Sequence, residues 1–451
     1  MKIHFIAIGG AVMHNLAIAL HLKGYTISGS DDEILDPSKS RLKKYGILPE
    51  KWGWDINNIS DKLDAVILGM HARPDNPELK RALDLKLKIY SFPEYLYEQT
   101  KDKKRVVIAG SHGKTTITSM IMHVLRRQNI QFDYMVGSQL EGFETMVGFS
   151  DESKIAIFEG DEYLSSPLDN RPKFIHYKPH LTLISGIAWD HMNVYPKYEN
   201  YKKQFFNLGL DTNSKGKVFY CESDLELKEM SRKWKKISDS GRETAVFEKY
   251  STLEYKQKDD YNEVVLDEKT FALKLIGRYN MENLNGAMKI CEGLGIKNET
   301  FLLSMKDFTG AARRQELIFQ NEKLKIYRDF AHAPSKVKAT VSGFREQFQN
   351  QKLTAILEIH TFSSLNKDFL PQYKESMNGA DSAYVFYNPE VVRHKKLPAL
   401  DKDFIKRCFD KKNLTILDDK SELETLMKKS IKGSGVLLLM SSGNFGGIDI
   451  L

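Results

Sequence analysis

One short motif constrains the fold of this chain more than any other feature. It reads Gly110, Ser111, His112, Gly113, Lys114, Thr115 and Thr116, and it directly follows the run 105–109, which is apolar after Arg105. After it, apolar residues recur at the spacing of one buried helical face, at Ile117, Met120, Ile121, Val124 and Leu125. A strand that enters a glycine turn and then a helix is typical of a phosphate-binding loop, because backbone N–H groups and the helix N-terminus both attract an anion.

Two side chains of this motif have predicted roles in nucleotide binding. Lys114 is expected to reach the outer phosphates, and Thr115 is expected to ligate Mg²⁺. Only two residues separate Gly110 from Gly113, whereas the common nucleotide loop has four. The alternative is a tight strand-to-helix turn with a lysine on the surface.

Composition limits the possible architecture and surroundings of the protein. At 451 residues the chain is too long for one core, and about three domains are expected. No apolar run approaches the ~20 residues of a membrane span, so we expect no membrane association. Three distant cysteines predict a reducing, cytoplasmic location without a disulfide framework. The net charge of +7 is dispersed, which fits anionic small molecules and gives no support for nucleic-acid binding.

Strands and helices alternate along most of the sequence, which predicts an α/β protein with parallel sheets. Three domains are expected, at residues 1–100, 101–309 and 310–451, with residues 98–104 as the first linker. In the first domain Gly9 and Gly10 form a turn after a strand over residues 3–8, and a second strand over residues 25–28 leads to Ser30 and Asp31. Residues 242–274 are expected to form short antiparallel strands. Further predicted strands cover residues 65–68, 155–159, 181–187, 325–327, 354–357, 383–387, 414–417 and 435–440.

Acidic and imidazole side chains follow two of the predicted strands. Glu159 ends the strand 155–159 and is the first choice for Mg²⁺, because a carboxylate at the carboxyl end of a strand often holds the metal opposite a phosphate loop. Asp161 and Glu162 could support that ligand or simply be solvated. His191, after the strand 181–187, could ligate a second Mg²⁺, although a single histidine is more often structural.

Later polar residues could complete a nucleotide site. Asn280 and Asn283 lie three residues apart on one helical face and could read an adenine edge, or Asn280 could cap the helix. Arg313 and Arg314 could neutralise charge in a transition state. Asp329 could orient an arginine or hold a ribose. Asp31 could bind a ribose or sugar hydroxyl, or serve as a turn or cap residue.

Taken together, these motifs resemble the Mur ligases, which build the peptide of bacterial peptidoglycan with ATP. The resemblance covers essentially the whole chain and includes residues 110–116, 159–162, 190–191, 280–283, 313–314 and 329–332. It implies a Rossmann-like N-terminal domain, a central P-loop ATPase domain and a Rossmann-like C-terminal domain for the incoming amine. It also implies ATP and Mg²⁺ as cofactors and UDP-N-acetylmuramate as a substrate.

The resemblance also assigns expected roles to residues. It implies a catalytic set of Lys114, Glu159, His191 and Arg314, and a metal set of Thr115, Glu159 and His191. ATP would contact residues 110–116, Asn280, Asn283, Arg313, Arg314 and Asp329. The UDP-sugar would contact Gly9, Gly10, Ser30 and Asp31. No residue is identified as the base that deprotonates the amine.

Two branches of this family use UDP-N-acetylmuramate itself, and they differ in the amine that they add. One branch adds L-alanine, and the other reattaches the recycled tripeptide L-alanyl-γ-D-glutamyl-meso-diaminopimelate. Three features resemble the tripeptide branch: residues 159–163 with the extra stretch 170–179, the C-terminal residues 440–448, and residues 329–332. The alternatives are the L-alanine branch, a ligase of the folyl or cyanophycin type, and a nucleotide-gated binding protein.

Overall fold

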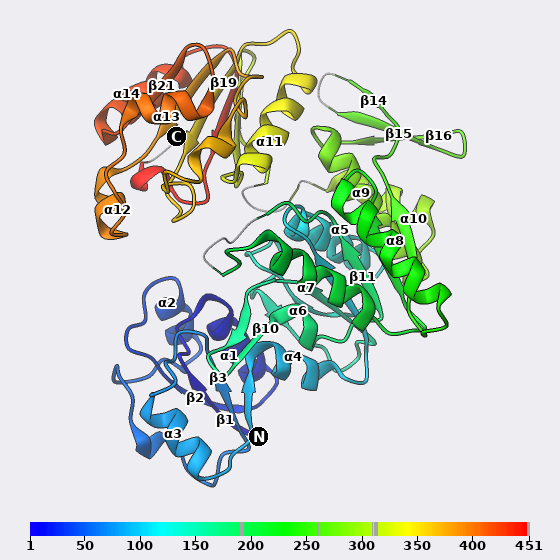
Figure 1. The fold of residues 1–451 in the computed structure, drawn as a ribbon, viewed down its shortest axis with the longest axis vertical. Coiled ribbons are helices and arrows are strands. Elements are labelled where there is room, and N and C mark those ends of the chain that lie inside the picture. Colours follow the sequence, from blue (N-terminus) through cyan, green and yellow to red (C-terminus); the bar gives the residue numbers. More distant parts are fainter. Residues whose placement is uncertain (190–193, 259–260, 309, 311–313, 449–451) are drawn as a thin grey trace. The chain divides into compact units, whose positions relative to one another are not determined.

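A computed structural model describes residues 1–189, 194–258, 261–308, 310 and 314–448. The chain divides into two compact units. The first contains Met1–Trp189, Val194–Ser251 and Gly286–Phe301, and the second contains Thr252–Asn285 and the residues from Leu302 onward. The fold is α/β throughout, as the sequence predicts (Figure 1). Within the described ranges, no helix combines the length and apolar character needed to cross a membrane.

The N-terminal part of the first unit holds a four-stranded parallel sheet of order β2-β1-β3-β4. Its strands are β1 (Lys2–Ile6), β2 (Thr26–Ser30), β3 (Ala65–Leu68) and β4 (Ile89–Ser91), and its helices are α1 (Ala11–Leu22), α2 (Ser38–Lys44), the 3₁₀ helix η1 (Ile56–Asn58), α3 (Pro77–Asp84) and α4 (Phe92–Thr100). Strand β1 ends two residues earlier than expected, because Ala7 turns to a positive φ of 68°. The Ala7 and Ile8 N–H groups then both donate to the Ser30 carbonyl, which joins the glycine turn to the end of β2.

A seven-stranded sheet of order β13-β12-β11-β5-β8-β6-β7 forms the rest of the first unit. Its strands are β5 (Lys104–Ala109), β6 (Asp133–Met135), β7 (Val147–Gly148), β8 (Ile155–Glu159), β11 (Leu181–Ile184), β12 (Lys217–Cys221) and β13 (Val246–Tyr250). Its helices are α5 (Lys114–Arg127), α6 (Lys173–His176), α7 (Tyr198–Asp211) and α8 (Leu225–Asp239), while α9 (Arg278–Gly293) and α10 (Asn298–Ser304) are divided between the two units. A two-stranded hairpin of β9 (Leu164–Ser166) and β10 (Asp169–Pro172) precedes α6. Strand β5 pairs in parallel with both β11 and β8, so the loop that follows β5 lies at the centre of the sheet.

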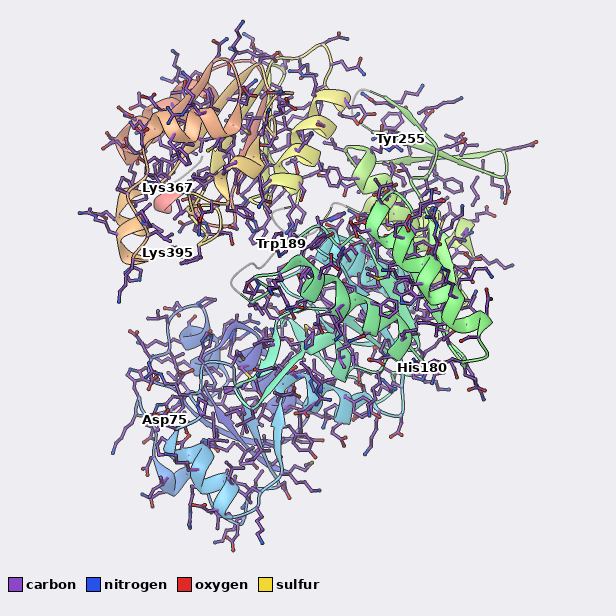
Figure 2. All side chains as sticks on the ribbon, in the orientation of Figure 1. Asp75, His180, Trp189, Tyr255, Lys367 and Lys395 are labelled. Atoms are coloured by element: carbon purple, nitrogen blue, oxygen red, sulfur yellow. The ribbon has the colours of Figure 1, made fainter. Side chains whose placement is uncertain are left out.

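Two sequence expectations are corrected in this unit. Strand β13 lies within residues 242–274, which the sequence predicts to be antiparallel. It instead pairs in parallel with β12 and is an edge strand of the seven-stranded sheet. Residues 98–104 are not a free linker, because α4 continues to Thr100 and β5 begins at Lys104. The Arg105 guanidinium donates to the Thr100, Lys101 and Lys103 carbonyls, which fixes the short connection to the strand. The N–H group of Arg105, the second residue of β5, donates to Nδ1 of His180, a residue labelled in Figure 2.

The second unit contains two sheets. An antiparallel sheet consists of β14 (Tyr255–Gln257), β15 (Asn262–Leu266) and β16 (Lys269–Leu273). The other sheet has the order β17-β18-β22-β19-β20-β21, and all its pairs are parallel except β17 with β18. Its strands are β17 (Glu316–Gln320), β18 (Leu324–Asp329), β19 (Leu353–Glu358), β20 (Ser382–Phe386), β21 (Leu414–Leu417) and β22 (Gly435–Met440), and the remaining helices of the unit are η2 (Met305–Asp307), α11 (Pro334–Gln347), η3 (Leu370–Tyr373), α12 (Pro389–His394), α13 (Lys402–Phe409), α14 (Lys420–Ile431) and η4 (Phe445–Gly447).

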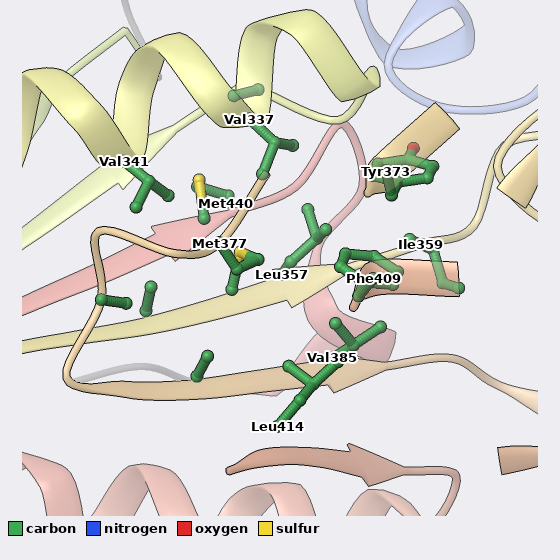
Figure 3. Close-up of a cluster of buried hydrophobic side chains, with 14 of the residues drawn as sticks. Val337, Val341, Leu357, Ile359, Tyr373, Met377, Val385, Phe409, Leu414 and Met440 are labelled. Carbon is green, nitrogen blue, oxygen red and sulfur yellow. The ribbon is translucent and has the colours of Figure 1, made fainter. Parts of the chain in front are cut away.

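Both faces of the six-stranded sheet are covered by apolar side chains. On one face Val337 and Val341 of α11 and Phe409 of α13 pack with Leu357 and Val385 of the sheet (Figure 3). On the other face a separate cluster includes Leu423 and Met427 of α14. Helices on both faces of a mostly parallel sheet define a doubly wound arrangement, in which ligands bind at the carboxyl ends of the strands.

Candidate active site

The phosphate loop has the backbone shape that its glycines predict. Gly110 and Gly113 have φ values of 131° and 76°, which strain any residue with a side chain. A Cβ atom at Gly110 would also collide with Ser185 of the neighbouring strand end. The Ser111 N–H donates to the Gly186 carbonyl at 2.8 Å. The loop is therefore held against the end of β11, with α5 beginning at Lys114.

Lys114 lies in an acidic environment. Its ammonium donates to the Gly110 carbonyl at 2.6 Å and to Glu162 Oε2 at 2.8 Å. Burial alone would lower the pKa of Lys114, but the Glu162 and Asp161 carboxylates outweigh it and hold that pKa above its ordinary value. Glu162 is fully buried, and its other oxygen accepts from the Tyr201 hydroxyl at 3.2 Å. A permanently charged ammonium beneath a glycine loop can bind phosphate oxygens.

Thr115 and Glu159 form the second pair at this edge of the sheet. The Thr115 hydroxyl donates to Glu159 Oε1 at 2.9 Å, and the Gly137 N–H donates to Glu159 Oε2 at 2.8 Å. A Cβ atom on Gly137 would lie 2.8 Å from Oε1, so glycine permits this close approach. Hydroxyl and carboxylate oxygens are the donors that Mg²⁺ prefers, and these two residues fit the metal that the sequence predicts.

The second unit brings together Asn280, Asn283 and Asp329 through a residue that the sequence did not indicate, Gln315. Asn280 donates to the Ile276 carbonyl at 3.0 Å and to Gln315 Oε1 at 2.6 Å. Asn283 donates to Asn280 Oδ1 at 3.2 Å. The Gln315 N–H donates to Asp329 Oδ2 at 2.9 Å. These buried amides form one network, and Asn280 lies inside the first turn of α9 rather than at its cap.

Asp329 is a buried carboxylate with several donors. Besides Gln315, the Ala331 N–H donates to it at 2.8 Å and Thr340 donates at 3.4 Å. Burial raises the pKa of Asp329, while Arg314 and these hydrogen bonds oppose the rise. The Arg314 guanidinium lies 4.5 Å from the centre of the Phe330 ring. His191 and Arg313 lie outside the described residues.

The four residues expected at the first sheet also lie together. The Gly9 N–H donates to Asp31 Oδ2 at 2.7 Å, and the Gly10 carbonyl faces His14 Nδ1 at 2.9 Å. Ser30 is buried, and its hydroxyl donates to Glu78. Asp31 thus joins the glycine turn to the end of β2, which matches the turn role that the sequence offers as an alternative to sugar binding.

The sequence does not predict the contacts of two residues in these networks. Glu162 has either a supporting or a solvated role by sequence, and its spacing from Lys114 gives no signal of their contact. Gln315 carries no motif of its own, although it follows Arg314 directly. Its φ of 51° and its hydrogen bonds to four residues, Ile276, Tyr279, Asn280 and Asp329, depend on how α9 and β18 pack.

A mostly parallel sheet with a compact phosphate loop, in a chain that also contains further α/β sheets, defines a nucleotide-dependent enzyme of multi-domain α/β architecture. Residues 2–104 match the description "Mur ligase family, catalytic domain" and residues 108–291 match "Mur ligase middle domain", together more than half of the chain. The chain belongs to the Mur ligase family. It is therefore an ATP-dependent ligase that forms amide bonds.

Relatives with two different names are similarly close. The chain is 26% identical to UDP-N-acetylmuramate–L-alanyl-γ-D-glutamyl-meso-2,6-diaminoheptandioate ligase of Escherichia coli (strain K12), over 99% of this chain and 96% of that one. It is 24% identical to UDP-N-acetylmuramate–L-alanine ligase of Desulfitobacterium hafniense (strain Y51), over 98% and 97%. A solved structure of UDP-N-acetylmuramate–alanine ligase from Thermotoga maritima shares the fold, with a TM-score of 0.71, 21% identity, and coverage of 99% and 97%.

Proposed function

We propose that this ligase joins the lactyl carboxylate of UDP-N-acetylmuramate to the amine of L-alanyl-γ-D-glutamyl-meso-diaminopimelate, in peptidoglycan recycling. The observation that carries the proposal is the pair of contacts at the sheet edge, Lys114 with Glu162 and Thr115 with Glu159. ATP phosphorylates the carboxylate, the amine attacks the acyl phosphate, and phosphate leaves. In this reaction the protein contributes mainly positioning and charge neutralisation.

Each group of residues has a separate task in this proposal. The N–H groups of residues 110–116 and the Lys114 ammonium hold the β- and γ-phosphates. Thr115 and Glu159 would hold Mg²⁺, which neutralises phosphate charge when it is bound, and His191 would hold a second ion. The amide network of Asn280 and Asn283 would read the adenine.

The remaining assignments concern charge neutralisation and the two other substrates. Arg313 or Arg314 would neutralise the transferring phosphoryl group, and Asp329 would orient that arginine or hold the ribose. The first sheet, with its turn at Gly9, Gly10, Ser30 and Asp31, would bind the UDP-sugar. The six-stranded sheet would bind the incoming amine. In this proposal the three domains comprise residues 1–100, 101–309 and 310–451.

The preference for the tripeptide rests on the segment between Glu162 and β11. Hairpin β9–β10 and helix α6 occupy this segment, which contains the extra stretch 170–179. The named relative of Escherichia coli also supports this choice. The specific alternative is L-alanine, because the Desulfitobacterium hafniense relative covers as much of the chain at nearly the same identity.

A substrate comparison tests the proposal. Purified protein is supplied with ATP, Mg²⁺ and UDP-N-acetylmuramate together with either the tripeptide or L-alanine, and ADP release and product mass are measured. We expect the tripeptide to be used at least ~10-fold more efficiently, a difference of about 1.4 kcal/mol in transition-state free energy. A preference for L-alanine would establish the alternative reaction. ADP release that needs neither cosubstrate would contradict both.

Other substrate classes are separated by binding. Protection of the protein against thermal unfolding by UDP-N-acetylmuramate is expected of the proposed ligase and not of a folyl or cyanophycin type.

A further inference from the structure

Three potential metal ligands meet at a place that the phosphate loop does not include. They are Glu94 of α4, Asp169 of β10 and His176 of α6, all in the first compact unit. One ligand atom from each can be chosen so that all three lie within 4.8 Å of one another. His176 Nε2 lies 3.2 Å from Asp169 Oδ2, and His176 Nδ1 lies 3.8 Å from Glu94 Oε1.

The imidazole of His176 is buried, and its Nε2 atom forms no hydrogen bond. Only 5% of its side chain is exposed, and Nε2 has no hydrogen-bond partner despite its closeness to Asp169. An imidazole nitrogen without a hydrogen-bond partner can offer its lone pair to a metal.

Both carboxylates are already oriented by other groups. Arg171 donates from Nε to Asp169 Oδ1 at 3.0 Å and from Nη2 to Oδ2 at 2.7 Å. Glu94 Oε2 accepts from the Ser91 N–H and hydroxyl, both at 2.8 Å, which leaves Oε1 on the side of His176. Outer hydrogen bonds of this kind fix ligating carboxylates and are typical of metal sites.

The donor set and its spacing suit a divalent cation. Two carboxylates face the imidazole, while Arg171 and Lys178 supply two positive charges nearby. Zn²⁺ with bonds of about 2.0–2.2 Å in tetrahedral geometry separates its ligand atoms by roughly 3.3–3.6 Å. The 3.2 Å between His176 Nε2 and Asp169 Oδ2 is close to that separation. Glu94 Oε1 lies 3.8 Å from the other ring nitrogen, Nδ1, so the Glu94 side chain must turn toward Nε2 to join the same ion.

We propose that Glu94, Asp169 and His176 bind a divalent cation of the Zn²⁺ class. One nitrogen and two carboxylate oxygens suit such an ion, and water would complete the coordination. The ion joins helix α4, which follows the last strand of the four-stranded sheet, to hairpin β9–β10 and helix α6. This hairpin directly follows Glu162, so the ion stabilises the segment that holds the partner of Lys114.

Metal binding to chelator-treated full-length protein tests the proposal. Zn²⁺ is titrated calorimetrically and Co²⁺ is titrated by its visible absorption, both in excess Mg²⁺. We expect one ion per chain and a higher melting temperature in Zn²⁺. Glu94→Gln should weaken binding at least ~10-fold, and because glutamine preserves the capping hydrogen bond to Ser91, the helix start should survive. Asp169→Asn and His176→Gln should weaken binding by at least the same factor.

Two matched controls separate this site from others. Glu98→Gln lies one turn further along α4 and pairs with Lys101, so binding should be unchanged. Glu159→Gln removes the expected magnesium ligand, and Zn²⁺ binding should again be unchanged. The proposal is overturned if the wild type binds no stoichiometric ion. It is equally overturned if Glu94→Gln and Asp169→Asn bind normally, or if only Glu159→Gln abolishes binding.

Discussion

The Lys114 ammonium lies 2.8 Å from Oε2 of Glu162, a carboxylate with no exposed surface. The two residues come from the start of α5 and from the turn after β8, which pairs with β5. A buried carboxylate therefore holds the ammonium that we propose binds phosphate. Phosphate oxygens could then replace Glu162 as the partner of the Lys114 ammonium, which is already protonated.

Replacement of Lys114 should remove catalysis while leaving UDP-sugar binding. Lys114→Ala deletes the charge that we propose contacts the outer phosphates, so we expect ATP-dependent ligation to fall below detection. Binding of UDP-N-acetylmuramate, measured by calorimetry, should stay within about twofold of wild type. Lys101→Ala, on the exposed turn before β5, serves as the control and should be fully active. Normal turnover of Lys114→Ala would disprove the assignment.

Replacement of Glu162 should act first on stability. Glu162→Gln leaves Lys114 partly buried without its carboxylate, and we expect the free energy of unfolding to fall by about 1–3 kcal/mol. Saturating ATP should reduce this loss, since its phosphates supply a new anionic partner. Chemical denaturation with and without ATP measures both effects. An equal loss in both conditions would argue that phosphate does not reach Lys114.

The Thr115 hydroxyl should matter for Mg²⁺ more than for folding. Thr115→Ala removes the donor to Glu159 and the expected metal ligand, so the Mg²⁺ concentration for half-maximal activity should rise at least ~10-fold. Thr115→Ser keeps the hydroxyl and should restore the wild-type value. Thr118→Ala, on the same helix, removes a buried hydroxyl without a hydrogen-bond partner and should leave the Mg²⁺ dependence unchanged.

Replacement of Gln315 should lower both the stability of the protein and its affinity for ATP. Gln315→Asn tolerates the positive φ of this position, but its shorter side chain cannot reach both Asn280 and Tyr279. We expect a loss of about 1–2 kcal/mol in unfolding free energy and a raised KM for ATP. Denaturation and steady-state kinetics provide the two readouts. A destabilised variant with an unchanged KM would show that the amide network does not contact the nucleotide.

The pH dependence of stability should include a contribution from His14. Burial and the nearby Arg41 lower the pKa of His14 below its ordinary value of 6.5, although the Gly10 carbonyl opposes them. Below pH 6.5 the unfolded chain therefore binds more protons at this residue than the folded chain. The free energy of unfolding should fall as the pH is lowered from 6.5 to the folded-state pKa, by at most about 1.4 kcal/mol per pH unit.

His14→Gln tests this contribution because glutamine does not titrate. Its unfolding free energy should depend less steeply on pH than that of the wild type below pH 6.5, as measured by denaturant titration at several pH values. Parallel curves for the two proteins would exclude His14 as a contributor.

Some strands could be predicted with their bounds, and others only approximately. Apolar runs bounded by turn residues gave residues 65–68, 155–159, 414–417 and 435–440 as the structure has them. Strand β13 was misjudged because its half-exposed pattern resembles that of a hairpin, and only its pairing with β12 assigns it to the central sheet. The polar composition of residues 98–104 suggested a linker, whereas Arg105 anchors that segment through carbonyl groups.

The phosphate loop can be predicted from its residues alone, since its features are local. Two glycines with positive φ, a strand before them and an amphipathic helix after them specify one backbone shape, and Lys114 and Thr115 follow from it. The distant side chains that meet that loop or meet one another are known only from the packing of the folded chain. Glu162 with Lys114, Gln315 with Asp329, and Glu94 with His176 are joined by sheet order and helix packing. Such contacts leave no periodic pattern in the chain, because they arise where separate elements come together.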